Sequence, residues 1–235
     1  MGNQINGQGL HFKESASVGK TYKQLHDLPL HLLEGRRYDG PLHKETPAMR
    51  YSHDHKAQTH QRIVREASGL FRRDGIGATG LQPLMKSLGL THGGFYAHFS
   101  SKNDLVEKAL QHAASQVDGI CAELFSQPQP LHAFIDAYLS EWHLTSPHEG
   151  CPLPTMSVEM AQQGQASATT DHVIDARLKQ IQATLQGADS EDKSIVIFAT
   201  LVGALVLARG AESDALKHKI FDVTRSALKQ SVPPA

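Results

Sequence analysis

The sequence has few cysteines, few aromatic residues and no long apolar run. Its 235 residues include two cysteines, one tryptophan and 6% aromatic residues in all. Cys121 and Cys151 are too few for a disulfide framework, and no secretory signal pattern precedes them. The longest apolar stretch, from Ile195 to Ala208, is shorter than the roughly 20 residues that a membrane helix needs. These absences predict a cytoplasmic protein with no membrane partner.

The composition is that of an ordinary globular protein, but the charge is unevenly distributed. Hydrophobic residues make up 40% and charged residues 20% of the chain, which is long enough to bury a real core. From Arg50 to Leu105, eight Lys and Arg stand against four Asp and Glu, a net charge of +4. From Val106 to the end, nine cations stand against 15 anions, a net charge of -6. This asymmetry indicates that one part of the chain meets a polyanion and the other does not.

Residues 1–48 differ from the rest of the chain. They are rich in Gly, His, Asn and Gln, with scattered prolines and no sustained apolar period. Such a composition cannot bury enough apolar surface to found a domain. We therefore expect a disordered leader, translated from a start upstream of Met49, with a short docking arm as the competing interpretation.

Beyond Met49 the apolar residues recur at helical spacing, and no strand pattern or internal repeat is present. The expected fold class is all-α, with about nine helices. A first helix ends near Asp74, and Gln127 to Pro130 break a later, long helix. The helices after the first are expected near 80–88, 92–98, 105–124, 131–142, 155–163, 171–186, 191–209 and 212–230.

Two short helices and a tight turn are expected between residues 80 and 99. Thr79 is predicted to cap the first helix, with Gln82 as the return partner of a capping box. Gly89 supplies the turn, and Thr91 caps the second helix. Two short helices with a glycine-containing turn in a basic region form a helix-turn-helix. The second helix of such a motif fits the major groove of DNA, where its N-terminal residues reach base edges.

Three residues of this segment are unusual in a helix. Pro83 is tolerated because it falls in the first turn, where its missing N–H has no partner in any case. Gly93 and Gly94 each lower helix stability by roughly 1 kcal/mol relative to Ala. Close approach of the backbone to a partner would compensate for this cost. Phe95 and Phe99 are expected to face inward and anchor the helix.

The order and spacing of the residues from Phe71 to Leu105 resemble the signature of the TetR/AcrR-type helix-turn-helix regulators. The resemblance implies a three-helix DNA-binding domain over residues 49–104. It also implies a larger helical domain for ligand binding and dimerisation over 105–235. Pro83 and the long leader depart from the family pattern. The matching residues are Phe71, Gly75, Thr79, Leu84, Gly89, Leu90 and the segments 94–99 and 101–105.

The resemblance also implies DNA contacts, residue by residue. Those nearest the base edges are Thr91, His92 and Gly93. Those that hold phosphates are Thr79, Tyr96, His98 and Lys102, with Thr79 acting through the N-terminus of its helix. For Tyr96 and Lys102 the alternatives are plain packing and a solvated charge, and the motif favours phosphate contact.

Three residues of the second domain are candidates to line a ligand cavity: Trp142, Cys151 and Met156. Aromatic and Met residues at helical spacing are more often plain core, so a core position is the favoured alternative for Trp142 and Met156. Cys151 lies in a loop that enters a helix, where the pKa of a thiol can be lowered to give a nucleophilic sensor. A small buried residue is the favoured interpretation.

The resemblance implies a homodimeric repressor that binds double-stranded DNA at a palindromic operator and is released by a small-molecule effector. The last two helices are expected to pair across a two-fold axis. We expect Val202 and Leu205 to face the partner. The ligand must bind the state that cannot hold DNA better than the state that can.

Other signals do not lead to a site. Residues 75–80 match the G-x-G-x-x-G string, but a helix precedes them and a dinucleotide site needs a strand. His53, His55 and His60 lack Cys or carboxylate partners at ligand spacing, so no metal is expected. No catalytic motif is present, so we expect no catalytic residue, no enzyme activity and no cofactor. A helical enzyme or carrier and a protein-interaction module remain the rivals, and the basic segment argues against the latter.

Overall fold

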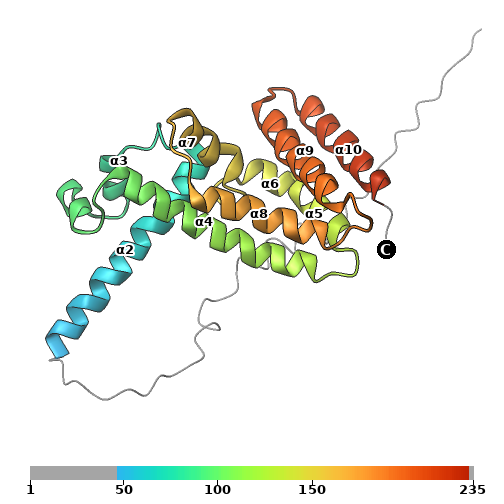
Figure 1. The fold of residues 1–235 in the computed structure, drawn as a ribbon. Coiled ribbons are helices and arrows are strands. Elements are labelled where there is room, and N and C mark those ends of the chain that lie inside the picture. Colours follow the sequence, from blue (N-terminus) through green and yellow to red (C-terminus); the bar gives the residue numbers. More distant parts are fainter. Residues whose placement is uncertain (1–46, 233–235) are drawn as a thin grey trace, which may run out of the picture.

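The computed structural model describes residues 47–232, and side chains from residue 54 onward. The predicted leader, 1–48, lies outside the described residues except for its last two positions. The described part contains nine α-helices and no strand, which confirms the all-α prediction (Figure 1). The helices are α2 (Pro47–Asp74), α3 (Leu81–Ser87), α4 (Lys102–Phe125), α5 (Pro130–Tyr138), α6 (Glu141–Thr145), α7 (Val158–Gln162), α8 (Ala168–Gln182), α9 (Ser190–Gly210) and α10 (Asp214–Ser231). A 3-10 helix, η2 (His92–Ala97), and a π turn, η3 (Leu153–Ser157), complete the set.

The helix α4 belongs to two hydrophobic cores. Its first half, with Leu105, Ala109 and Leu110, packs with α2, α3 and η2 in an N-terminal core. Its second half, with Val117 and Leu124, packs with α5, α8, α9 and α10 in a C-terminal core. Figure 1 shows α3 and η2 at one end of the molecule and the α9–α10 pair at the other. Since α4 runs between them, the helix-turn-helix and the C-terminal bundle share one rigid element.

Several expected elements differ in detail. The apolar stripe expected as one helix over 131–142 is divided, because α5 ends at Tyr138 and the Ser140 hydroxyl accepts a hydrogen bond from the His143 amide at 3.2 Å, which caps α6. The helix expected near 155–163 is the π turn η3 followed by α7. The second helix of the helix-turn-helix is a single 3-10 segment, consistent with the low helix propensity of Gly93 and Gly94.

The helix α9 is long and apolar enough to cross a membrane by length and composition alone. An 18-residue window within its 21 residues has a mean hydropathy of 1.7. The same values occur in core helices, and α9 packs between α8 and α10. The choice of Leu205 as a partner-facing residue is wrong, because Leu205 is fully buried within the chain. Val202 is half-buried, and Val206 is the neighbour that points outward.

Candidate functional site

The helix-turn-helix is held by a small aromatic base. Phe95 and Phe99 are 0% and 2% exposed, and their rings stack with centroids 5.3 Å apart. The Thr91 hydroxyl accepts a hydrogen bond from the Gly94 amide at 3.2 Å, which confirms the predicted cap. Gly89 has a φ of +72°, a left-handed conformation that glycine adopts without strain. The turn and η2 are therefore fixed on the N-terminal core.

On this base, η2 presents a polar and aromatic surface. Thr91, His92 and Gly93 are exposed, and Tyr96 is 62% exposed. The His92 and Tyr96 rings meet edge to face with centroids 6.0 Å apart. A Cβ placed on Gly93 would have nothing within 4 Å, so the monomer itself does not require glycine there. The residues predicted to lie near bases share one accessible face.

Thr79 does not cap α3. The N-cap is Gly80 and makes no side-chain bond, while the Thr79 hydroxyl donates to the Gly75 carbonyl at 2.7 Å. Thr79 is 7% exposed, because this bond holds its side chain inside the turn before α3. The capping-box prediction is therefore wrong, and a phosphate contact at this helix end concerns the backbone alone.

The two basic candidates, His98 and Lys102, already have places in the fold. The Lys102 ammonium donates to the Ile76 carbonyl at 2.5 Å and so ties the start of α4 to the turn before α3. Burial, aided by His60 and Lys56, lowers the pKa of His98. A neutral His98 offers a hydrogen bond to a phosphate without a charge.

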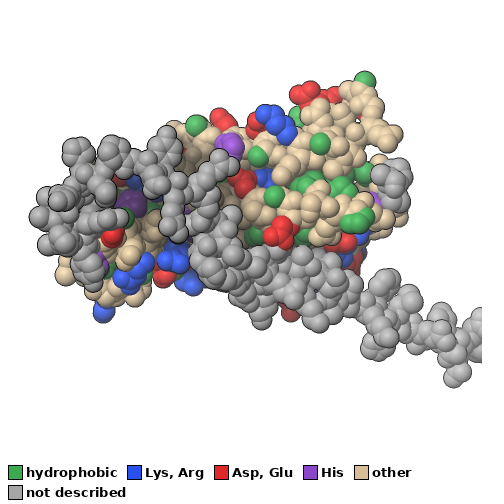
Figure 2. All heavy atoms as spheres, turned by 90° about the horizontal axis from the view of Figure 1, so that it is seen from below, with side chains coloured by type: hydrophobic (Ala, Val, Ile, Leu, Met, Phe, Trp, Pro, Cys, Tyr) green, Lys and Arg blue, Asp and Glu red, His purple; other side chains and the backbone are tan. Residues whose placement is uncertain are grey.

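Exposed cations surround this end of the molecule. Figure 2 shows Lys and Arg side chains close together near α2 and α3. Arg73 is held by a bidentate pair with Asp74 at 2.8 Å, whereas the Arg62 guanidinium only contacts the Leu88 carbonyl at 3.3 Å. Lys56, Arg62, Arg65 and Lys86 are exposed. Such a cluster attracts a polyanion.

The C-terminal core encloses a cavity of about 10 Å³, about the space of one water molecule. Cys151 lines this cavity, and whether a ligand binds there stays a prediction. Trp142 and Met156 do not line it: Met156 is fully buried in the N-terminal core, and Trp142 stacks on His143 with ring centroids 6.5 Å apart. The lining residues are Val117, Cys121, Phe134, Tyr138, His143, Cys151, Val173, Arg177 and Phe198.

Three polar lining groups were not found from the sequence. Arg177 lies on the buried face of α8, between Val173 and Ile181. A charged residue at a position where the helical period predicts an apolar one was the sequence signal for a buried polar group. His143 is fully buried, with its pKa lowered to about 3 by burial and by Arg209. Cys121 is buried on α4 and also lines the cavity.

The thiols of the cavity are not activated. Burial raises the pKa of the Cys151 thiol, and that of Cys121 to about 12 although Arg177 lies beside it. Protonated thiols are poor nucleophiles. The structure favours the interpretation of Cys151 as a small buried residue.

A loop joins this cavity to the helix-turn-helix domain. The Arg72 guanidinium of α2 donates to the Gly150 carbonyl at 3.0 Å, and the next amide, of Cys151, donates to His143 Nε2 at 3.0 Å. Arg209 donates to the His143 carbonyl at 2.6 Å. A Cβ on Gly150 would lie 2.4 Å from the His143 ring, so only glycine fits. The wall of the cavity is thus bonded to α2.

A second bond network joins α7 to the turn after α2. The Glu159 carboxylate accepts hydrogen bonds from the Ile76 amide at 3.1 Å and the Gly77 amide at 2.8 Å. Gly75 has a φ of +93°, and a Cβ there would overlap the same carboxylate. The G-x-G-x-x-G string therefore forms a turn that receives a carboxylate from the second domain.

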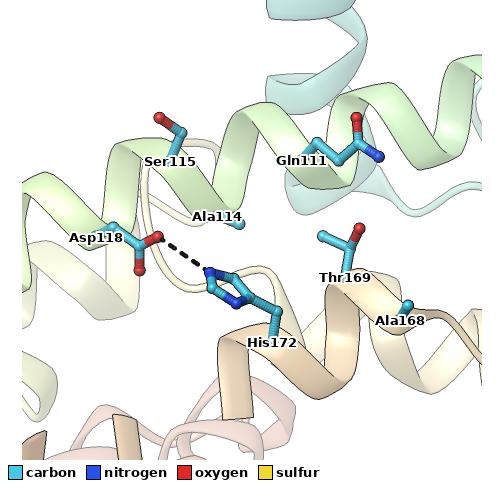
Figure 3. Close-up of a pocket in the computed structure, with 7 residues that line it drawn as sticks. All are labelled: Gln111, Ala114, Ser115, Asp118, Ala168, Thr169 and His172. Atoms are coloured by element: carbon cyan, nitrogen blue, oxygen red, sulfur yellow. Dashed lines mark ion pairs between the residues drawn. The ribbon is translucent and has the colours of Figure 1, made fainter. Parts of the chain in front are cut away.

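An open groove lies between α4 and α8, with a volume of about 340 Å³ (Figure 3). His172 Nε2 is 3.9 Å from Asp118 Oδ2 across it. Within residues 54–232 no group of three or more His, Cys, Asp or Glu could hold a metal ion. The groove is lined by Gln111, Ala114, Ser115, Asp118, Ala168, Thr169 and His172.

Comparisons with known proteins agree with this geometry. Residues 63–109 match the family model of bacterial regulatory proteins, tetR family. An uncharacterized HTH-type transcriptional regulator of Mycobacterium tuberculosis is 26% identical over 161 residues, which are 63% of this chain and 83% of that protein. A TetR transcriptional regulator from Chloroflexus aurantiacus has a similar structure, with a TM-score of 0.62 and 25% identity, over 77% of this chain and 100% of that one. A TetR-family regulator from Cytophaga hutchinsonii has the same TM-score at 18% identity, over 75% of this chain and 96% of that one, and so shows the fold alone.

Proposed function

Since the chain belongs to the TetR family of transcriptional regulators, we propose that it is a cytoplasmic homodimeric repressor that a small-molecule inducer releases from a palindromic operator. The proposal involves no catalysis. The observation that carries it is the exposed face of η2, with Thr91 to Gly93 and Tyr96 accessible on a buried aromatic base. A segment so placed can enter the major groove without rearrangement of the domain.

In the proposed complex, His92 and the flanking Thr91 and Gly93 approach base edges. Tyr96 and Lys102 lie further along and hold phosphates. Among the exposed cations of α2 and α3, Arg65 and Lys86 add attraction for DNA of any sequence. In this arrangement the start of η2 reads the bases, and the residues around it position the protein on the DNA backbone.

An exposed apolar face supports the dimer. On α9, Ile195 and Val206 are 48% and 42% exposed; on α10, Leu216 and Val223 are 49% and 60% exposed. The two helices lie side by side at the end of the molecule away from η2 (Figure 1). Gly203 has open space around it, which lets a partner helix approach closely. Two copies of this face form a four-helix bundle across a two-fold axis.

The bond networks of Arg72 and Glu159 support the proposed release. A molecule that enlarges the cavity displaces Cys151 or His143, and these residues position the Gly150 carbonyl that Arg72 contacts. Movement of α2 then changes the separation of the two recognition segments, which must be about 34–36 Å for neighbouring grooves. The inducer acts if it binds the displaced state more tightly.

A mobility-shift assay with the DNA upstream of the protein's own gene tests the function. We expect a single complex whose stoichiometry is two chains per site. Its affinity should exceed that for unrelated DNA of equal length by at least about 10³-fold at moderate salt. Tyr96→Ala should weaken the complex, while Ile174→Ala, at an exposed site on α8, is the matched control. Equal affinity for unrelated DNA would contradict sequence-specific regulation.

A further inference from the structure

The buried Arg177 side chain separates two hollows of the C-terminal domain. Arg177 lines the enclosed cavity, and its Nη2 donates to Asp118, which lines the open groove between α4 and α8. The side chain of Arg177 is 2% exposed and that of Asp118 is 39% exposed. The ion pair is therefore the partition between the cavity and the groove.

Neither hollow alone suits a small-molecule ligand. Ligand pockets are generally about 300–1,000 Å³ and mostly apolar, with a few placed polar groups. The groove has the volume, about 340 Å³, but its rim is polar, with Gln111, Ser115 and Thr169. The cavity has apolar walls, including Phe134 and Phe198, but only about 10 Å³. If the Arg177–Asp118 pair opened, the two hollows would form one pocket with an apolar floor and a cation at its neck.

The guanidinium has a donor without an acceptor. Nη1 donates to Gln180 Oε1 at 2.7 Å and Nη2 donates to Asp118, but Nε has no hydrogen-bond partner among the described residues. The neighbouring Cys121 thiol is only a weak acceptor. A buried donor left unpaired is unfavourable, so an incoming acceptor gains from meeting it.

We propose that this pocket binds a small molecule with a carboxylate and a short apolar body, and that the carboxylate replaces Asp118 on Arg177. The fork of an arginine matches a carboxylate with two parallel hydrogen bonds. Asp118 can turn away because it is partly solvated and faces His172 across the groove, as Figure 3 shows. The apolar body is larger than the cavity of about 10 Å³, so it enters against Phe134 and Phe198 only as these side chains move apart. The binding itself does not depend on the proposed function. Only the role of the bound molecule as the inducer rests on it.

The experiment compares benzoate and hexanoate with benzamide and hexanamide, by titration calorimetry and by thermal unfolding of the full chain without DNA. We expect the carboxylates to bind and the amides not to bind. Asp118→Asn should lower the unfolding temperature of the free protein, since it leaves Arg177 without its counter-ion. The same variant should bind the carboxylates about tenfold more tightly, because the side chain at position 118, which competes with the ligand for Arg177, is then neutral.

The matched control is Asp175→Asn, on the exposed side of α8, where Asp175 pairs with Lys179. It should bind the carboxylates as the wild type does. Arg177→Gln should abolish binding; if it fails to fold, Asp118→Asn still decides. The proposal is overturned if no carboxylate binds, if acid and amide bind alike, or if the two Asn variants behave alike.

The two proposals fail separately. If the protein binds operator DNA but no carboxylate, the proposed carboxylate pocket is contradicted and the proposed regulatory function is not. If the protein binds carboxylates but does not shift operator DNA, the proposed regulatory function is contradicted and the proposed pocket is not.

Discussion

The two cores of this chain differ in what they bury. The N-terminal core is built from apolar side chains such as Phe71, Leu84 and Phe95, and its buried Arg72 lies where the two domains meet. The C-terminal core surrounds His143 and Arg177, two buried groups that can carry charge, and encloses the cavity between them. A close-packed apolar core resists deformation. In a core with polar groups beside a cavity, those groups can exchange one hydrogen-bond partner for another.

The two halves of α4 differ in the same way, because one packs in the N-terminal core and the other lines the cavity and the groove. The half of the helix in the N-terminal core holds η2 in one geometry, which DNA reading requires. The other half lines both the cavity and the groove, through Val117 and Asp118. If a small molecule occupies the second region as proposed, the change would reach the first through α4, besides the contacts of Arg72 and Glu159.

The largest effect is expected from charges placed on α9. Leu205 is fully buried, so Leu205→Arg should abolish cooperative folding, at a cost of about 3–5 kcal/mol for an uncompensated buried charge. Val206 is 42% exposed, so Val206→Arg should fold and yield a monomer. Denaturant unfolding and sedimentation equilibrium distinguish these results. A folded dimer from Val206→Arg would place the interface elsewhere.

A smaller effect is expected from pH. The pKa of His143 is about 3 in the fold and about 6.5 when unfolded, so the unfolded chain binds the proton first as the pH falls. Stability is complete above about pH 6.5 and declines toward pH 3, by about 2 kcal/mol at pH 5 for this one group. His98 and His112, whose pKa values burial also lowers, add to the same trend.

The contribution of His143 is isolated by substitution. His143→Gln should be less stable at neutral pH, because the Cys151 amide loses its acceptor, but its stability should fall less steeply with acid. His148→Gln, at an exposed site in the loop that follows α6, is the control and should keep the wild-type slope. Equal slopes in all three proteins would show that His143 does not remain neutral.

The all-α fold, the helix-turn-helix and the inward direction of Phe95 and Phe99 followed from local patterns. Apolar spacing of three and four residues fixes which face of a helix is buried, and Gly89 marks its own turn. The cap at Thr79 was wrong because its hydroxyl donates to the Gly75 carbonyl instead of accepting a hydrogen bond from a backbone amide of α3. Local sequence does not rank such alternatives.

The cavity and its polar groups depend on contacts between distant segments. Arg177 and Asp118 are 59 residues apart in the chain, and Arg72 and Gly150 are 78 apart. No periodicity within one helix relates such positions. The apolar stripe of α9 indicated burial, but it could not separate the buried face, with Leu205, from the exposed face, with Val206.

Gly93→Ala tests whether the N-terminal region is built for DNA or for its own stability. The added methyl group has open space, so the free protein should be as stable as the wild type or slightly more stable. If the backbone of η2 approaches DNA closely, operator affinity should fall about tenfold, or about 1.4 kcal/mol. Gly119→Ala, also in open space but on α4, is the control for both measurements. Unchanged operator affinity for Gly93→Ala would remove η2 from the interface.

The smallest effect is expected at Lys102, where a structural and a DNA-binding role coincide. Lys102→Ala removes the hydrogen bond to the Ile76 carbonyl, which is part-buried, and should lower stability by about 1 kcal/mol. If the ammonium also holds a phosphate, affinity should fall alike for all sequences, and the plot of log affinity against log salt should flatten by about one unit. His92→Ala should keep the salt slope and change which bases are preferred, since the exposed imidazole of His92 lies on the face predicted to read them. A Lys102→Ala protein with wild-type salt slope but altered base preference would assign Lys102 to the fold of the turn, with its effect on DNA transmitted through Ile76.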